Sequence, residues 1–105
     1  MNTAKITRFL AEAIEWTPAN KDEHLWGFDP MNDIAHAWMV VEWMLEKQVD
    51  IALDSGWECV FYGFNEEGNL EDLGTSEAKT APEAICIAAV RALADEKQLG
   101  EMGIK

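Results

Sequence analysis

The sequence predicts an α+β fold, an αβα sandwich in which helices cover both faces of a three-stranded, mainly antiparallel sheet. Three observations support this prediction. Three segments carry apolar residues at helical spacing, and three shorter segments between the second and the third have the pattern of strands. The middle strand is apolar on both faces, which is typical of a central strand that is covered from both sides. The predicted order is helix, helix, strand, strand, strand, helix.

The first helix is predicted over residues 3–16. Apolar residues recur there at helical spacing and charged residues fall between them, which is typical of a helix with one buried side. Pro18 marks its end, because proline cannot continue a helix. The residues expected in the core are Ile6, Phe9, Leu10 and Ala13.

A loop is predicted over residues 17–31, which contain two prolines, a glycine and mixed charge. The loop also carries Trp26 and Phe28. Two large rings in a polar loop usually fold back onto the core as a plug, because each ring buries a large area, and less often they line a ligand pocket. The sequence leaves both interpretations open.

The second helix is predicted from Asn32, an N-cap candidate just after Pro30, to about Gln48. A helical projection places one apolar set on the core face: Ile34, Ala37, Trp38, Val41, Met44 and Leu45. The opposite side is also apolar, so something must cover it. Exposed apolar patches most often mark protein contacts, which favours a second subunit or the loop over a ligand. The predicted oligomer interface consists of His36, Met39, Val40 and Trp43.

Three strands are predicted at 49–53, 57–64 and 70–79, separated by turns at 54–56 and 65–69. The middle strand places Trp57, Cys59 and Phe61 on one face and Val60, Tyr62 and Phe64 on the other. The last strand is polar, which suits the edge of a sheet.

The third helix is predicted to begin at Thr80, which forms a capping box with Glu83, and to end by Gly100. Its expected buried residues are Cys86, Ala89, Val90 and Leu93, flanked by Ile85 and Ile87, and its expected outward residues are Ala84, Ala88, Arg91 and Asp95. We expect one domain over residues 1–105, with a core at about 3–99 and a frayed tail at 100–105.

Two segments resemble the helix-starting signatures of a known family. They are FDPMNDIAHAWMVVEWMLEK at residues 28–47 and TAPEAICIAAVRAL at residues 80–93. Both are similar to the phage ABA sandwich domain, a family of small proteins of tailed bacteriophages and prophages. The resemblance covers residues 26–97 well and implies the same αβα architecture. Family sequences tend to have serine or threonine before the second helix, and Asn32 preserves that capping chemistry.

The composition limits where the protein works and what it binds. Hydrophobic residues make up 49% of the 105 residues, which excludes intrinsic disorder. No run approaches the roughly 20 apolar residues of a membrane span, and the N-terminus lacks the layout of a signal peptide. We therefore expect a cytoplasmic protein with no membrane partner, and the resemblance implies the cytoplasm of an infected bacterial cell.

The formal net charge of -12, from 20 acidic and 8 basic residues, would repel a phosphate backbone. We therefore expect no direct binding of nucleic acid. The acidity permits a DNA mimic, although the carboxylates are spread along the chain, as on an ordinary solvated surface. Cys59 and Cys86 are expected to be buried free thiols, and with His24 and His36 they have no metal-ligand spacing, so we expect no metal and no cofactor.

No nucleophile elbow, phosphate loop or zinc motif is present in the sequence. Asp33 and His36 are three residues apart on the second helix, where such a pair is far more often a surface pair than an acid–base couple. The resemblance supplies no catalytic residues either. We expect a protein that is not an enzyme.

Two functional hypotheses remain. The first, which draws on what is usual for small accessory proteins of phages, is a counter-defence protein that sequesters a small nucleotide signal as a homo-oligomer. Aromatic rings can stack on nucleobases, and the candidate ligand-binding residues are Trp26, Phe28, Asn32, His36, Trp57 and Tyr62. The alternative is an acidic inhibitor or DNA mimic that binds a host protein, such as a defence protein, through its carboxylates.

Overall fold

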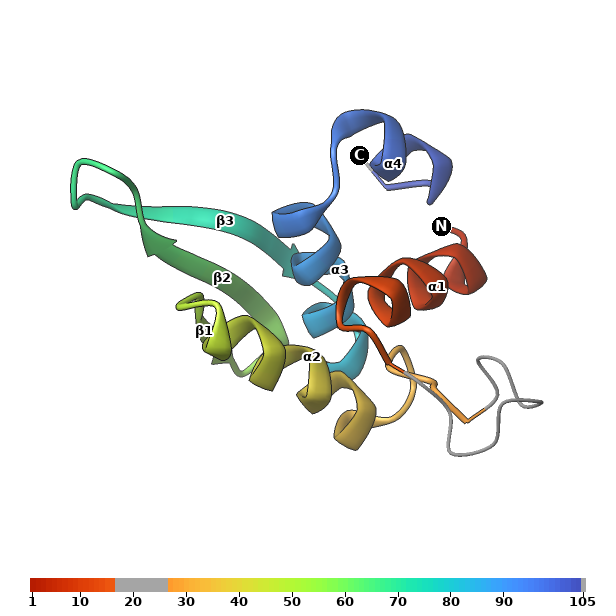
Figure 1. The fold of residues 1–105 in the computed structure, drawn as a ribbon. Coiled ribbons are helices and arrows are strands. Elements are labelled where there is room, and N and C mark those ends of the chain that lie inside the picture. Colours follow the sequence, from red (N-terminus) through yellow and green to blue (C-terminus); the bar gives the residue numbers. More distant parts are fainter. Residues whose placement is uncertain (17–26, 105) are drawn as a thin grey trace.

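The protein is described by a computed structural model that covers residues 1–16 and 27–104 (Figure 1). Its elements are α1 (Thr3–Ala13), α2 (Ile34–Glu46), β1 (Asp50–Asp54), β2 (Glu58–Phe64), β3 (Leu70–Glu77), α3 (Ala81–Leu93) and α4 (Glu96–Glu101). The α+β class, the predicted element order and the antiparallel sheet are confirmed. The short helix α4 is an addition to the predicted order.

The sheet is a meander with the order β1-β2-β3, so β2 is the central strand and β3 lies at an edge, as predicted. Val60 of β2 lies opposite Ala52 on one side and opposite Thr75 on the other. A bulge between Phe61 and Tyr62 shifts the register of β3 by one residue. Such a bulge bends and twists the strand locally.

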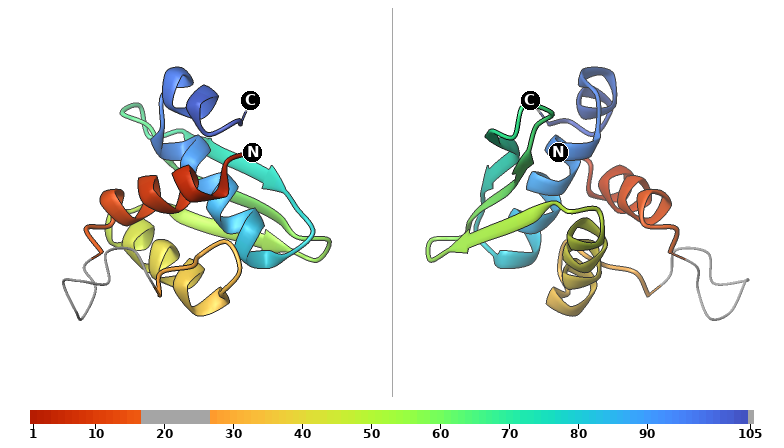
Figure 2. Two further views of the ribbon diagram at one scale, coloured as in Figure 1. Left: turned by 90° about the vertical axis from the view of Figure 1, so that its right-hand side faces the viewer. Right: turned by 60° about the vertical axis from the view of Figure 1, so that its left-hand side comes forward.

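The described helices all lie on the same side of the sheet (Figures 1 and 2). α2 and α3 contact the sheet, and α1 packs on α3 from the far side. The sequence predicts helices on both faces, because β2 is apolar on both. In β2, however, only Cys59, Phe61 and Gly63 are buried, whereas Val60 and Tyr62 on the other face are half-buried. The apolar side chains of that second face have no helix over them in the described part of the chain.

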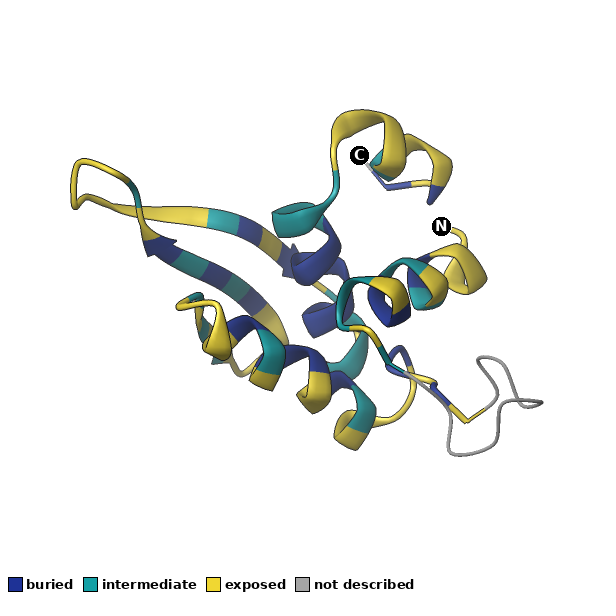
Figure 3. Cartoon of the chain, viewed as in Figure 1, coloured by how far each residue is buried: buried dark blue, intermediate teal, exposed yellow. Residues whose placement is uncertain are grey.

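α3 is the middle layer: it lies between the sheet and α1 and packs beside α2, and most of it is buried (Figure 3). Every residue from Ala84 to Val90 is buried. The prediction that Ala84 and Ala88 face outward is therefore wrong, because a middle-layer helix is covered on nearly all sides. α3 approaches β3 so closely at Gly74 that a Cβ atom there would lie 2.1 Å from the Ala88 carbonyl oxygen.

The segment after α3 does not fray. α3 ends at Leu93, and Asp95 with Gln98 forms a capping box that starts α4. Met102 and Ile104 are buried in the core cluster, and the Asn2 amide donates to the Met102 carbonyl at 2.7 Å. The predicted tail at 100–105 is therefore wrong for the described residues up to Ile104, because its apolar side chains complete the core beside α1.

Candidate functional site

The start of α2 brings together part of the predicted ligand-binding set. Phe28 is 3% exposed and stacks on Trp16 with the ring centroids 5.1 Å apart, and its ring lies 5.8 Å from that of His36. Phe28 is thus a plug of the core, one of the two interpretations that the sequence leaves open. Trp26 lies outside the described residues. Because Phe28 is already covered by protein, it offers no free face to a nucleobase.

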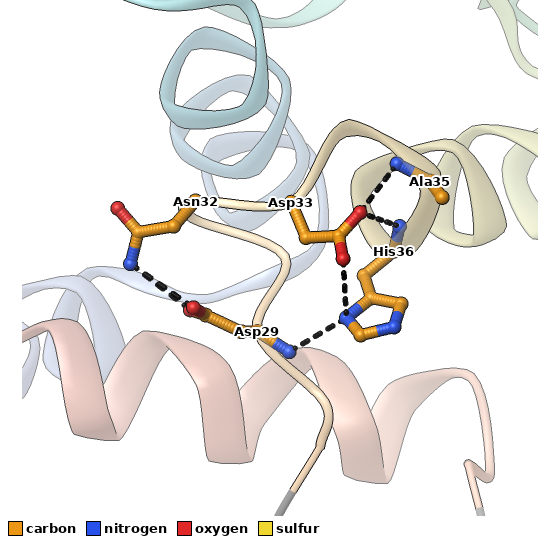
Figure 4. A network of polar contacts seen from close by, with 5 residues as sticks. All are labelled: Asp29, Asn32, Asp33, Ala35 and His36. Carbon is orange, nitrogen blue, oxygen red and sulfur yellow. Dashed lines mark hydrogen bonds and ion pairs between the residues drawn. The ribbon is translucent and has the colours of Figure 1, made fainter.

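A network of polar contacts fixes the backbone before α2 (Figure 4). The Asp29 amide donates to Nδ1 of His36 at 2.9 Å, and the Asn32 side-chain amide donates to the Asp29 carboxylate at 3.1 Å. His36 therefore positions the loop. Its Nδ1 lies 3.8 Å from the Asp33 carboxylate, and this contact is secondary to the shorter backbone bond.

The N-terminus of α2 is occupied by the chain itself. The N-cap is Asp33 and not the predicted Asn32, because the Asp33 carboxylate accepts from the amides of Ala35 at 2.9 Å and His36 at 3.4 Å. Free amides at a helix N-terminus attract anions. Here the Asp33 carboxylate already accepts hydrogen bonds from the amides of Ala35 and His36, so a phosphate would have to displace that carboxylate.

The predicted oligomer interface on α2 is only partly at the surface. Val40 is fully buried, so its assignment to that interface is wrong. Trp43 is half-buried beneath the Lys47 ammonium, 5.4 Å from the ring centroid, and Met39 is exposed. The prediction for the core face of α2 is confirmed for only part of its residues. Ala37, Val41 and Met44 are buried, whereas Ile34, Trp38 and Leu45 are exposed. The small Ala37 and the β-branched Val40 and Val41 belong to the buried core cluster, so the buried side of α2 is rotated relative to the projection.

The two most exposed of the large apolar side chains lie on the side of the sheet that faces away from the helices, here called the outer face. Phe64 and Leu70 form a cross-strand pair near the tip of the β2–β3 hairpin, and they are 72% and 59% exposed. Opposite partners in an antiparallel ladder share a face, so the register defines this surface. Its apolar residues are Ala52, Val60, Tyr62, Phe64 and Leu70.

Carboxylates flank this apolar stripe on both outer strands. Glu58 lies between Asp54 and Glu77 in one cross-strand row. Like charges in directly opposite positions destabilise a sheet. The remaining residue of the outer face is Thr75. No outer-face position on β1, β2 or β3 holds a lysine or arginine. The carboxylates are those of Asp50, Asp54, Glu58, Asp72 and Glu77.

The sequence shows the alternation that creates the outer face but does not show that the face is open. Tyr62 is the one predicted ligand-binding residue that the register places there. Trp57 precedes β2 and is exposed in a left-handed conformation, with φ 55°. The predicted ligand-binding residues therefore do not form one site, because Phe28, Asn32 and His36 lie on the helical side of the sheet.

A shallow groove between α1 and α4 contains two cationic side chains that are not among the site residues predicted from the sequence. It is lined by Lys5, Arg8, Phe9, Glu12, Gln98, Glu101 and Met102. Lys5 and Arg8 lie one turn apart on α1, beside a half-buried aromatic ring. Two carboxylates share the groove, so its local charge is balanced.

Both cysteines are buried free thiols, as predicted. Burial raises the pKa of the Cys59 thiol to about 11. Burial raises the pKa of Cys86 still further, with smaller contributions from the charges of Asp29, Cys59 and Glu83. A thiol must ionise to act as a nucleophile, so neither group is activated at neutral pH. Among residues 1–16 and 27–104, no group of three or more histidine, cysteine or acidic side chains could hold a metal ion.

These features define a class: a small α+β protein in which helices pack on one face of a three-stranded antiparallel sheet. The sequence model of the phage ABA sandwich domain matches residues 3–90. The chain therefore belongs to the phage ABA sandwich domain family. Neither the curated proteins nor the solved structures contain a match. No helix in the described ranges is long and apolar enough to cross a membrane.

Proposed function

We propose that this protein is a non-enzymatic accessory protein of a phage or prophage that binds a basic surface of a host protein. The observation that carries the proposal is the outer face, where exposed apolar side chains lie between carboxylates. Large exposed apolar side chains that lie together mark interaction sites. Arg91 of α3 reaches the Thr75 carbonyl at one margin of this face, but the strand positions of the face hold five carboxylates and no lysine or arginine. Such a surface selects a positively charged partner, because complementary potentials accelerate encounter and exclude partners of like charge.

Affinity capture from a bacterial lysate freed of nucleic acid tests this proposal. The wild-type protein is compared with Glu58→Lys/Glu77→Lys on the outer face and with Glu42→Lys/Glu46→Lys on α2, which changes the net charge equally. We expect a basic host protein that the wild type and the α2 variant retain, that the outer-face variant loses, and that salt releases. Identical capture by all three proteins would refute the proposal.

A second candidate function is sequestration of a nucleotide signal. The groove between α1 and α4 supports it, because Lys5 and Arg8 could hold a phosphate beside Phe9. The capped start of α2 and the buried Phe28 give no such support. A thermal-shift screen with cyclic dinucleotides and cyclic ADP-ribose variants tests it, since a ligand at 100 times its dissociation constant adds about 2.7 kcal/mol. A shift that Lys5→Glu/Arg8→Glu abolishes would establish this function, and a flat screen would remove it.

A further inference from the structure

We propose that the outer face binds a basic amphipathic α-helix of the partner, laid along β2 as a second helical layer. This inference rests on the proposed function and specifies the partner's structure. β2 has apolar residues on both faces, and helices α2 and α3 cover only one of them. Layered folds bury each apolar sheet face against another element. The partner's helix would supply the layer that the described chain does not place there.

A helix suits this face better than an extended segment does. A segment that lies across a sheet face cannot form hydrogen bonds with the strands beneath it. An extended chain would therefore leave its own backbone N–H and C=O groups unpaired at the interface, which is costly. A helix pairs those groups internally and presents only side chains.

The dimensions of the outer face match those of a helix. Strands lie about 4.8 Å apart, so β1 and β3 are separated by about 9.6 Å across β2, close to the roughly 10 Å diameter of a helix. The carboxylates of Asp50 and Asp54 then lie along one flank of the bound helix, and those of Asp72 and Glu77 along the other.

The apolar stripe sets the length of the contact. Val60, Tyr62 and Phe64 span about 13 Å of β2 at roughly 3.3 Å per residue. About nine helical residues cover that length at 1.5 Å each. The partner's helix therefore needs apolar residues at positions i, i+3 or i+4 and i+7, with lysine or arginine on both flanks of that stripe.

A second copy of this chain does not fit the outer face. Face-to-face pairing would bring the same carboxylates of two copies together, and each copy carries a net charge of -12. The exposed apolar residues of α2 are no better suited, because Glu42 and Glu46 are exposed on the same helix. Like charges at an interface cost several kcal/mol, so the occupant must be a basic partner.

Two synthetic peptides of identical lysine, leucine and alanine composition test the inference. One places leucine at helical spacing and the other places it at alternate positions. We expect the helical-pattern peptide to bind at least tenfold more tightly, as measured by calorimetry, and to gain helical circular dichroism on binding. Phe64→Asp and, separately, Leu70→Asp should weaken this binding at least tenfold. Leu45→Asp, an exposed position on α2, should leave it unchanged.

Each alternative result overturns a different part of the reasoning. Equal binding of the two peptides refutes the helical occupant and leaves the acidic binding function in place. Tighter binding of the alternating peptide also refutes it and indicates strand addition at an edge of the sheet, along β1 or β3. Loss of binding with Leu45→Asp instead of Phe64→Asp moves the site to α2. If neither peptide binds, both the inference and the preference for a basic partner fail. Thermal unfolding of both outer-face variants checks that they remain folded.

Discussion

Replacement of Gly74 by alanine should separate α3 from the sheet. The added Cβ would lie 2.1 Å from the Ala88 carbonyl oxygen, 2.6 Å from the Ala92 amide nitrogen and 3.0 Å from the Ala92 Cβ. Ordinary contacts begin at 3.4 Å, so α3 must move by about 1.3 Å (3.4 − 2.1). The nearest two atoms belong to the backbone of α3 and cannot rotate away.

The cost follows from the position of α3 as the middle layer. Overpacking a core costs about 1–3 kcal/mol, and a shift of α3 disturbs its contacts with both the sheet and the other helices. We expect a loss of about 3 kcal/mol in the free energy of unfolding. For a domain of this size, each kcal/mol lowers the midpoint temperature by about 4–8 °C. The melting temperature should therefore fall by on the order of 15 °C.

Urea unfolding followed by circular dichroism measures this loss, and Gly63→Ala is the matched control. At Gly63 the nearest atoms to an added Cβ are Cδ1 of Leu73 at 3.6 Å and the Gln48 carbonyl oxygen at 3.7 Å. Alanine there should be neutral or stabilise by about 0.4–1 kcal/mol through the unfolded chain. If Gly74→Ala unfolds within about 0.5 kcal/mol of the wild type, the close approach of α3 to β3 is refuted.

Two further predictions concern the buried thiol and the α2 cap. Burial raises the pKa of Cys59 from 9.0 to about 11. The stabilising contribution of the neutral thiol is therefore complete below pH 9 and is lost as the pH rises towards 11, by on the order of 2 kcal/mol. Urea midpoints should fall across this window, and less steeply in Cys59→Ala, whereas parallel curves would contradict the assignment. Asp33→Ala removes the carboxylate that accepts from the first amides of α2 and should lower the unfolding free energy by about 1 kcal/mol. Asp33→Ser should retain most of the wild-type stability in the same assay, because serine also caps helices. Equal losses in the two variants would show that capping is not the cause.

The sequence predicts the sheet well because strand alternation and turn residues are local signals. The meander, the central β2 and the cap at Thr80 depend on neighbouring residues only, and all are found. The buried side of α2 is not predictable in this way. Because both sides of α2 are apolar, packing alone decides that Val40 is buried and Trp38 is exposed.

The layer arrangement depends on long-range contacts, which explains the remaining differences. Alanine is small enough to face solvent or a neighbouring helix, so Ala84 and Ala88 give no local sign of their burial in the middle layer. Gly74 does carry a signal, because a glycine inside a strand often marks a close approach of another backbone. Of the candidate binding surface, only the alternation in β2 is visible in the sequence, and it does not reveal which face remains open.

The carboxylates of the outer face also bear on colloidal behaviour. An exposed apolar pair such as Phe64 and Leu70 at the tip of a hairpin would promote aggregation of an uncharged protein. Charged neighbours act as gatekeepers that keep copies apart. The isoelectric point of the sequence is about 4.3, and near that pH mutual repulsion vanishes and association is promoted. The protein's solubility is thus tied to the acidic surface through which it would find its partner.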